Sequence, residues 1–178
     1  MRLRPLTNAL PKPLVKIKGK PMLSYLIEYL CCYGVTKIIV AAGYQSEHIK
    51  RFIKNHYPDR GISIVDSGDV DIIERIQDAR NLIKDDFFVF YGDTLSNVDL
   101  TRLTQFHKAG HHSATVAVWP LKSQFGVFEI NNDGLIARFE EKPTLDKWIN
   151  IGHFCFEKSM LDLMQHYSSF KDFLSSLV

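Results

Sequence analysis

The sequence lacks a long hydrophobic run. No uninterrupted apolar stretch approaches the roughly 20 residues that a membrane-spanning helix needs. The N-terminus also lacks the apolar segment of a secretory signal, and its prolines would break the amphipathic helix of an organellar transit peptide. We therefore expect a cytoplasmic protein without a membrane partner.

Cysteine is scarce, and neither sign of charge dominates. Cys31 and Cys32 are adjacent and Cys155 is distant, so neither a disulfide framework nor a zinc motif is indicated, and free thiols are expected. The net charge is +2, which gives no overall basic field toward nucleic acid. With 178 residues, 46% of them hydrophobic, the chain has the composition of one globular domain spanning 1–178.

The order of apolar patterns predicts an α/β fold. Helices are expected at 21–33, 46–57 (with a serine cap at Ser46), 71–84 and 99–109 (capped by Asp99). Strands are expected at 36–43, 62–66 and 86–93. This alternation is typical of βα crossovers and of a mainly parallel sheet covered on both faces. The rhythm then changes to strands at 113–120, 125–130, 135–142 and 148–157, a hairpin turn at 131–134 and a helix at 158–167.

The first 27 residues lack any acid. They hold Arg2, Arg4, Lys12, Lys16, Lys18 and Lys20, with prolines at positions 5, 11, 13 and 21. Arg2 and Lys12, on a path stiffened by proline, could hold two cations against one polyphosphate. The alternative is a frayed, solvated terminus, against which the density of prolines argues.

Two acidic segments are candidates for binding. In YGDT (91–94), Asp93 follows an apolar strand, where open α/β sheets bind ligands, and its carboxylate could hold Mg²⁺ against phosphate oxygens. The alternative is that Asp93 caps a turn. In FEEKP (139–143), alternation places Glu141 on the face opposite to Glu140 and Lys142, although such a run is more commonly a solvated strand end.

Two weaker patterns also suggest metal. Asp69 and Asp71 form a D-x-D, as in nucleotide-sugar glycosyltransferases, but so short a string is frequent by chance. His107 and His111 have the spacing of helix-borne zinc ligands, yet Gly110 between them is expected to end the helix. No G-x-S-x-G nucleophile motif is present.

Taken together, RLRPLTNALPKPLVKIKGKPML, YGDT, FGVFEI, FEEKP and NIG, in this order, resemble sugar-1-phosphate nucleotidyltransferases. YGDTLSNVDL, WPLKSQFGVFE and LDKWINIGHF are particularly similar to the branch of mannose-1-phosphate guanylyltransferases and glucose-1-phosphate cytidylyltransferases. The resemblance implies a Rossmann-like three-layer α/β/α fold with a mixed, mainly parallel sheet. It implies transfer of a nucleotidyl group from a nucleoside triphosphate, with GTP or CTP favoured, to a sugar 1-phosphate.

The resemblance also implies residue roles. Nucleotide binding would fall to Arg2, Lys12, Gly68 and Gly92; sugar-phosphate binding to Gly126, Glu141, Lys142, Asn150 and Gly152; and Mg²⁺ binding to Asp93. Arg2, Lys12, Asp93 and Lys142 would be catalytic and would converge on two mutually repelling anions. The oligomeric state stays open, with a homo-oligomer allowed.

The chain departs from the family pattern at both ends. The family's first strand and its glycine-rich loop do not precede Arg2; the backbone N–H groups of that loop cradle the triphosphate in the family. The family's second metal-binding acid does not follow the last residues. Three interpretations stay open: an incomplete form of an active enzyme, a degenerate relative, or a sugar-phosphate-binding protein without catalysis. Loss of the first strand should remove a partner from the strands on both sides of it.

Overall fold

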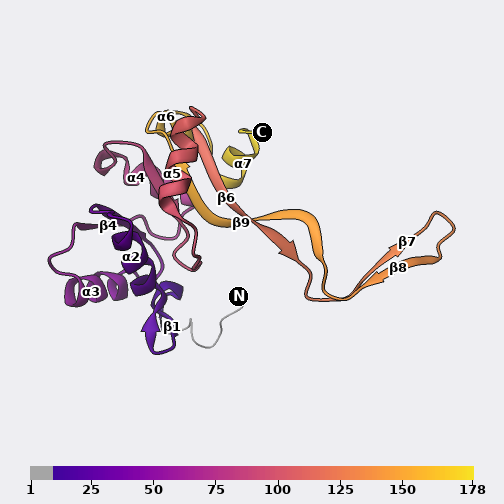
Figure 1. Ribbon diagram of the computed structural model, residues 1–178. Helices are drawn as coiled ribbons and strands as arrows, with labels where there is room; N and C mark the ends of the chain where they lie inside the picture. Colours follow the sequence, from indigo (N-terminus) through magenta and orange to yellow (C-terminus); the bar gives the residue numbers. More distant parts are fainter. Residues whose placement is uncertain (1–9) are drawn as a thin grey trace.

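The computed structural model describes residues 10–178, in which helices and strands alternate through the first half (Figure 1). The elements are η1 (Lys12–Leu14), β1 (Lys16–Ile17), β2 (Lys20–Pro21), α2 (Met22–Cys32), β3 (Ile38–Ala42), α3 (Ser46–His56), β4 (Ile62–Asp66), α4 (Ile72–Asp78), η2 (Arg80–Leu82), β5 (Phe87–Phe90), α5 (Leu100–Ala109), β6 (Ala114–Lys122), β7 (Val127–Ile130), β8 (Ile136–Glu140), β9 (Thr144–Phe156), α6 (Met160–Met164) and α7 (Phe170–Ser175). The predicted α/β fold is confirmed.

The first sheet pairs β3 with β4 in parallel. Helices α2 and α3 cover it with a stripe of apolar side chains, Leu23, Ile27, Ile49 and Ile53. Leu14 of η1 joins this core, so the proline-rich segment is fixed to the body of the protein. Burial of these side chains supplies the hydrophobic stabilisation of this half.

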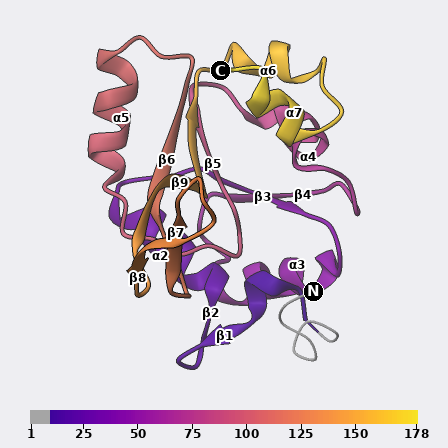
Figure 2. The ribbon, with the colours of Figure 1, turned by 90° about the vertical axis from the view of Figure 1, so that its right-hand side faces the viewer.

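The second sheet has the order β5–β9–β6, and all its pairings are antiparallel. Figure 2 shows α5 on one side of it and α4, α6 and α7 on the other. Phe154 and Phe156 of β9 point into the core beneath α4, α6 and α7. Thr115 of β6 is on the opposite side, where its hydroxyl lies 2.8 Å from Nδ1 of the buried His107 of α5. Helices therefore cover both faces, as the three-layer prediction requires.

The two sheets are separate, because β3 and β5 do not pair with each other. Within residues 10–178, parallel pairing is found between β3 and β4 alone. The residues of β5 are only half-buried, although all four are valine or phenylalanine.

A long ribbon extends from the second sheet and carries the β7–β8 hairpin away from the rest of the molecule (Figure 1). It consists of the outer parts of β6 and β9 and the whole of β7 and β8, residues 118–149, which we call the arm. β9 is longer than the predicted 148–157, because its first residues pair with the end of β6.

Several local predictions need correction. Ser46 is the first residue of α3 rather than its cap; Gln45 precedes it in the left-handed conformation, and the Ser46 hydroxyl donates to Asp66 instead. Helix α7 and the β1–β2 hairpin were not predicted. Asp99 does cap α5, since its carboxylate accepts from the Arg102 amide.

The three cysteines lie among the described residues, and all are free, as expected. Burial raises the pKa of Cys155 to about 11, which leaves it a neutral packing group rather than a nucleophile. None of the helices in residues 10–178 combines the length and apolar character required to traverse a bilayer.

Candidate functional site

Lys12 and Asp93 come together at the end of β5. The Lys12 ammonium lies 3.3 Å from a carboxylate oxygen of Asp93, although 81 positions separate them in the sequence. Both side chains are about half exposed, so the pair is open to a ligand. A cation and a hard carboxylate side by side at a strand end can hold an anion and a metal ion together.

Prolines hold Lys12 in this position. Pro11 is in an extended conformation, and its carbonyl accepts from the Leu14 amide at 2.9 Å. Pro13 packs against Gly92, where a β-carbon would lie 3.2 Å from the proline ring. The predicted stiffening of the segment is therefore seen at Lys12, whereas Arg2 lies outside the described residues.

A second group of predicted residues meets Tyr91, next to Asp93. The Tyr91 amide donates to the Gly152 carbonyl at 2.9 Å, and the Gly152 amide donates to Oδ1 of Asn150 at 2.7 Å. Gly152 has a positive φ of 73°, and a β-carbon there would lie 2.4 Å from the Tyr91 ring. It lies in a β-bulge, where the pairing of β6 shifts from His153 to Asn150. Bulges of this kind often redirect side chains beside active sites.

Sequence reasoning missed Tyr91. Burial raises the pKa of its hydroxyl, and the negative charges of Asp71 and Asp93 act in the same direction, whereas a hydrogen bond with Asn150 acts against them. Tyr91 therefore remains a neutral hydrogen-bonding group near the Asp93 carboxylate. Its place directly before Gly92 and Asp93 was the signal that could have revealed it.

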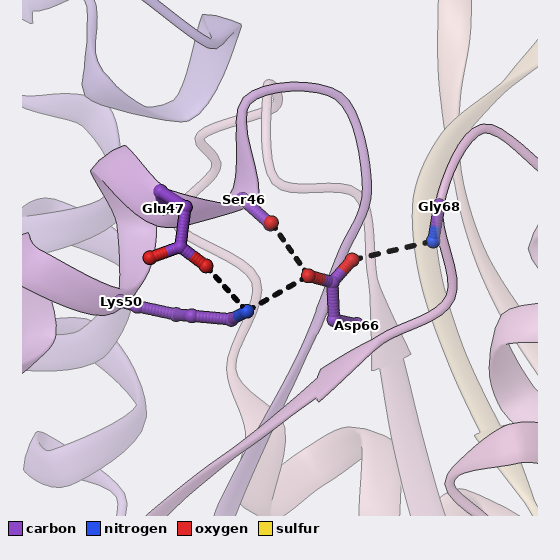
Figure 3. A network of polar contacts seen from close by, with 5 residues as sticks. All are labelled: Ser46, Glu47, Lys50, Asp66 and Gly68. Carbon is purple, nitrogen blue, oxygen red and sulfur yellow. Dashed lines mark hydrogen bonds and ion pairs between the residues drawn. The ribbon is translucent and has the colours of Figure 1, made fainter.

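A polar network lies where β3 and β4 end and α3 begins (Figure 3). Asp66 accepts from the Ser46 hydroxyl at 2.6 Å and from the Lys50 ammonium at 2.9 Å, and Lys50 also pairs with Glu47 at 2.7 Å. The Gly68 amide donates to the other oxygen of Asp66 at 3.3 Å. Gly68, predicted to contact the base, thus belongs to a loop at the carboxyl ends of the parallel strands.

Replacing Asp66 by asparagine is expected to lower the melting temperature by a few degrees at pH 6. Hydrogen bonds from Ser46 and Lys50 lower the pKa of Asp66 to about 2. A depressed pKa in the folded state stabilises the protein above the usual aspartate range, near pH 4, and this stabilisation is lost as the pH falls toward 2. Thermal unfolding at pH 6, 4 and 2.5 checks this. If the difference in melting temperature between the wild type and Asp66→Asn does not shrink in acid, the stabilising role of Asp66 is contradicted. The same holds if substitution of the exposed Asp59 by asparagine lowers the melting temperature equally.

The D-x-D motif has a structural role at its second position. Oδ1 of Asp71 accepts from the Ile73 amide at 3.0 Å, which caps α4, and from the Phe170 amide at 2.8 Å. Asp69 is exposed. Among residues 10–178, no three His, Cys, Asp or Glu side chains are grouped so as to hold a metal by themselves. The glycosyltransferase interpretation therefore gains no support.

Replacing Asp71 by alanine is expected to destabilise the fold by about 1–2 kcal/mol, because two amides lose their acceptor. Asp71→Asn keeps an oxygen in place and should retain most of the stability. Urea unfolding monitored by circular dichroism measures both, with Asp69→Ala as the control. Equal losses in the alanine and asparagine variants would argue against the capping role.

The zinc interpretation of His107 and His111 is not supported. Gly110 ends α5, as predicted, and His111 follows it with a positive φ of 49°. His107 is buried and contacts Thr115, whereas His111 is exposed. The two imidazoles therefore do not share one helical face.

The remaining predicted residues lie in the arm. Glu141 and Lys142 follow β8, with their charged atoms 3.6 Å apart and more than half exposed. Gly126 precedes β7, and a β-carbon there would meet the Phe139 ring at 2.5 Å and Glu141 at 3.0 Å. Roughly 30 Å of extended chain separates Thr144, which follows this group, from His153 beside the site. The predicted convergence is therefore observed for Lys12 and Asp93 but not for Lys142.

A model of the nucleotidyl transferase family matches residues 1–178. The chain belongs to this family. The match covers every segment discussed above, including the arm. It confirms the resemblance that the motifs indicated.

Curated relatives of this nucleotidyl transferase family member support the same family assignment. The mannose-1-phosphate guanyltransferase of Gibberella zeae is 36% identical over 176 residues, which cover 92% of this chain and 48% of the relative. A Bacillus subtilis protein named "Probable glucose-1-phosphate cytidylyltransferase" is 31% identical over 186 residues, covering 92% of this chain and 73% of the relative. The chain thus spans about half the length of the fungal relative.

The fold is also found in solved structures. HddC from Yersinia pseudotuberculosis, in a complex with GMP-PN, superimposes with a TM-score of 0.70 at 23% identity. The superposition covers 90% of this chain and 73% of HddC. At this identity the likeness establishes the nucleotide-diphospho-sugar transferase fold and nothing finer.

Proposed function

We propose that this protein transfers a nucleotidyl group from a nucleoside triphosphate to a sugar 1-phosphate and releases pyrophosphate. The observation that carries the proposal is the 3.3 Å contact of Lys12 with Asp93 at the end of β5. Relatives of this protein are named as guanylyl- and cytidylyltransferases, and these names support GTP or CTP as its donor.

The reaction joins two anions. A phosphate oxygen of the sugar 1-phosphate attacks the α-phosphorus, and the bond to the pyrophosphate leaving group breaks. Lys12 neutralises phosphate charge and lowers the repulsion between the reactants. Because Pro11 and Pro13 fix its backbone, little ordering is needed when the ligand binds.

Asp93 fits a magnesium ion. Mg²⁺ commonly binds proteins through one or two carboxylates and takes its other ligands from phosphates and water, so a single half-exposed carboxylate suffices. When bound, the ion would neutralise the triphosphate and the charge that develops on the leaving group. The Lys12 ammonium, 3.3 Å from Asp93, holds this carboxylate at the end of β5.

Asn150, Gly152 and Tyr91 would form the wall for the sugar. The neutral Tyr91 hydroxyl and the Asn150 amide offer hydrogen bonds of the kind that sugar hydroxyls accept and donate. Because Gly152 has no side chain, the Tyr91 ring can pack against its backbone, and this contact holds Tyr91 in the wall.

Pyrophosphate release in Mg²⁺ tests the proposal, with each of GTP, CTP, ATP and UTP combined with mannose, glucose and heptose 1-phosphates. We expect turnover with GTP or CTP and one of the sugars, at rates far above the reaction without protein. Calorimetric binding of a sugar 1-phosphate with no turnover for any pair would instead support a non-catalytic sugar-phosphate-binding protein.

A further inference from the structure

One short segment of β9 holds the loop between β5 and α5 on both sides of Asp93. This β5–α5 loop forms neither helix nor strand. Two residues before Asp93, the Tyr91 amide donates to the Gly152 carbonyl at 2.9 Å. Three residues after it, the Ser96 hydroxyl lies 2.9 Å from Nε2 of His153. The two anchors of the loop are therefore adjacent residues of β9.

Two hydrogen bonds fix the proton on the His153 ring. Nδ1 lies 2.9 Å from the carbonyl oxygen of Ile151, which can only accept, so Nδ1 carries the hydrogen. Nε2 is then an acceptor, and the Ser96 hydroxyl donates to it. Burial lowers the pKa of His153, so the ring is neutral at pH 7.5 and the hydroxyl keeps this direction of donation.

Packing holds the His153 ring in place. Alternation along β9 turns Phe154 toward α4, α6 and α7, and His153 toward the opposite face, which α2 and α5 cover. There the ring is fully buried, and the Phe90 ring meets it edge-on with the centroids 4.7 Å apart. The Tyr29 ring of α2 packs on it as well, with the centroids 6.4 Å apart. Ser96 is therefore bonded to a rigid group.

The other contacts next to Asp93 are weaker. The Thr94 amide donates to the Tyr91 carbonyl at 3.3 Å, which is longer than most bonds of this kind. The ion pair of Asp93 with Lys12 is half exposed, and exposed pairs stabilise little. The position of the Asp93 carboxylate therefore depends chiefly on the anchors that β9 supplies.

We propose that the Gly152 carbonyl and the His153 imidazole form a clamp that positions Asp93 for magnesium, with His153 acting through Ser96. This inference rests on the proposed function, because it assigns the Asp93 carboxylate to the metal. Mg²⁺ demands nearly ideal octahedral geometry, and a carboxylate that is already held in place needs less ordering when the ion binds. His153 is a positioning residue, because it is fully buried and acts through another side chain.

Hydrogen exchange in the protein without ligands tests the clamp independently of activity. NMR follows the amides of Tyr91 and Thr94, which lie on either side of Asp93 and do not bond to Ser96. Ser96→Ala removes the hydroxyl and should speed the exchange of both amides by about 5-fold. Ser96→Thr keeps a hydroxyl at a half-buried position and should restore the slow exchange.

Thr115→Val is the matched control for Ser96→Ala. It also removes a hydroxyl that contacts a buried histidine, since Oγ1 of Thr115 lies 2.8 Å from Nδ1 of His107. Thr115 pairs with Cys155, further along β9 from the site, so the exchange of the loop amides should not change. Equal exchange of these amides in Ser96→Ala and Thr115→Val overturns the clamp.

Nitrogen NMR of the imidazole rings tests the contact between His153 and Ser96. The signals of His153 are assigned by their loss in His153→Gln. At pH 7.5 we expect Nε2 to be unprotonated and hydrogen-bonded, and Ser96→Ala to shift its signal because the donor is lost. An Nε2 signal that Ser96→Ala does not move overturns the proposal.

The magnesium dependence of pyrophosphate release separates positioning from stability. Ser96→Ala should raise the Mg²⁺ concentration for half-maximal rate and lower kcat, each by about 5-fold. The KM for the sugar 1-phosphate should stay near that of the wild type, because Asn150 and Gly152 are unchanged. Thr115→Val should retain all three values.

Two failures of the kinetic test have different meanings. If Ser96→Ala keeps the kcat and the magnesium dependence of an active wild type, Ser96 does not position Asp93 and the proposal is overturned. A wild type inactive with every substrate pair overturns the proposed function instead, while hydrogen exchange and nitrogen NMR still decide whether His153 holds the loop.

Discussion

Replacing Asp93 by asparagine is expected to lower nucleotidyl transfer by about 10²–10³-fold. The substitution keeps the size of the side chain but removes the charge that pairs with Lys12 and would hold Mg²⁺. The loss should fall mainly on kcat, because the stabilised charge develops as pyrophosphate leaves. Steady-state pyrophosphate release at saturating Mg²⁺ measures it.

Asp85→Asn is the matched control for Asp93→Asn. Asp85 is an exposed acid that precedes β5, whereas Asp93 follows it, so both substitutions change the charge near the same strand. Near-native kcat is expected for Asp85→Asn. Near-native kcat for Asp93→Asn would show that the carboxylate has no catalytic role.

Replacing Gly152 by alanine is expected to destabilise the protein by about 2–5 kcal/mol. The residue has a positive φ of 73°, which costs other residues about 1–2 kcal/mol. The added methyl would also lie 2.4 Å from the Tyr91 ring and displace it, at a cost of about 1–3 kcal/mol. Urea unfolding followed by tryptophan fluorescence measures the loss.

Gly134→Ala separates the two causes. Gly134 has nearly the same φ, 79°, in the hairpin turn of the arm, but a β-carbon there meets no atom within 4 Å. Its substitution should cost only the backbone strain, about 1–2 kcal/mol. Equal losses at both positions would mean that the contact with Tyr91 contributes nothing to stability.

Local patterns predicted most of the fold. The apolar run of 62–66 and the Asp99 cap of α5 lie where expected, because both depend on short-range preferences. The course of the arm could not be predicted, because alternation in 125–130 and 135–142 gives the faces of a hairpin but not its direction in space. The role of Ser46 was misjudged because Asp66, 20 positions away, takes its hydroxyl.

The candidate site was predicted only in part, because contacts between residues far apart in the sequence do not follow from local patterns. Motifs located Lys12 and Asp93, and their contact depends on the packing of Leu14 and Pro13, which pattern alone does not reveal. Lys142 was expected beside them, but strand pairing places it in the arm. Tyr91 was overlooked because its environment arises from β9, some 60 positions further along the chain.

Calorimetric titration of GTP and CTP, with and without Mg²⁺, tests most directly whether Lys12 and Asp93 hold one metal–triphosphate together. For the wild type, Mg²⁺ should tighten nucleotide binding. Lys12→Ala should bind more weakly but still respond to Mg²⁺, whereas Asp93→Asn should lose the response. If Asp93→Asn binds the magnesium nucleotide as the wild type does, the end of β5 is not the phosphate and metal site.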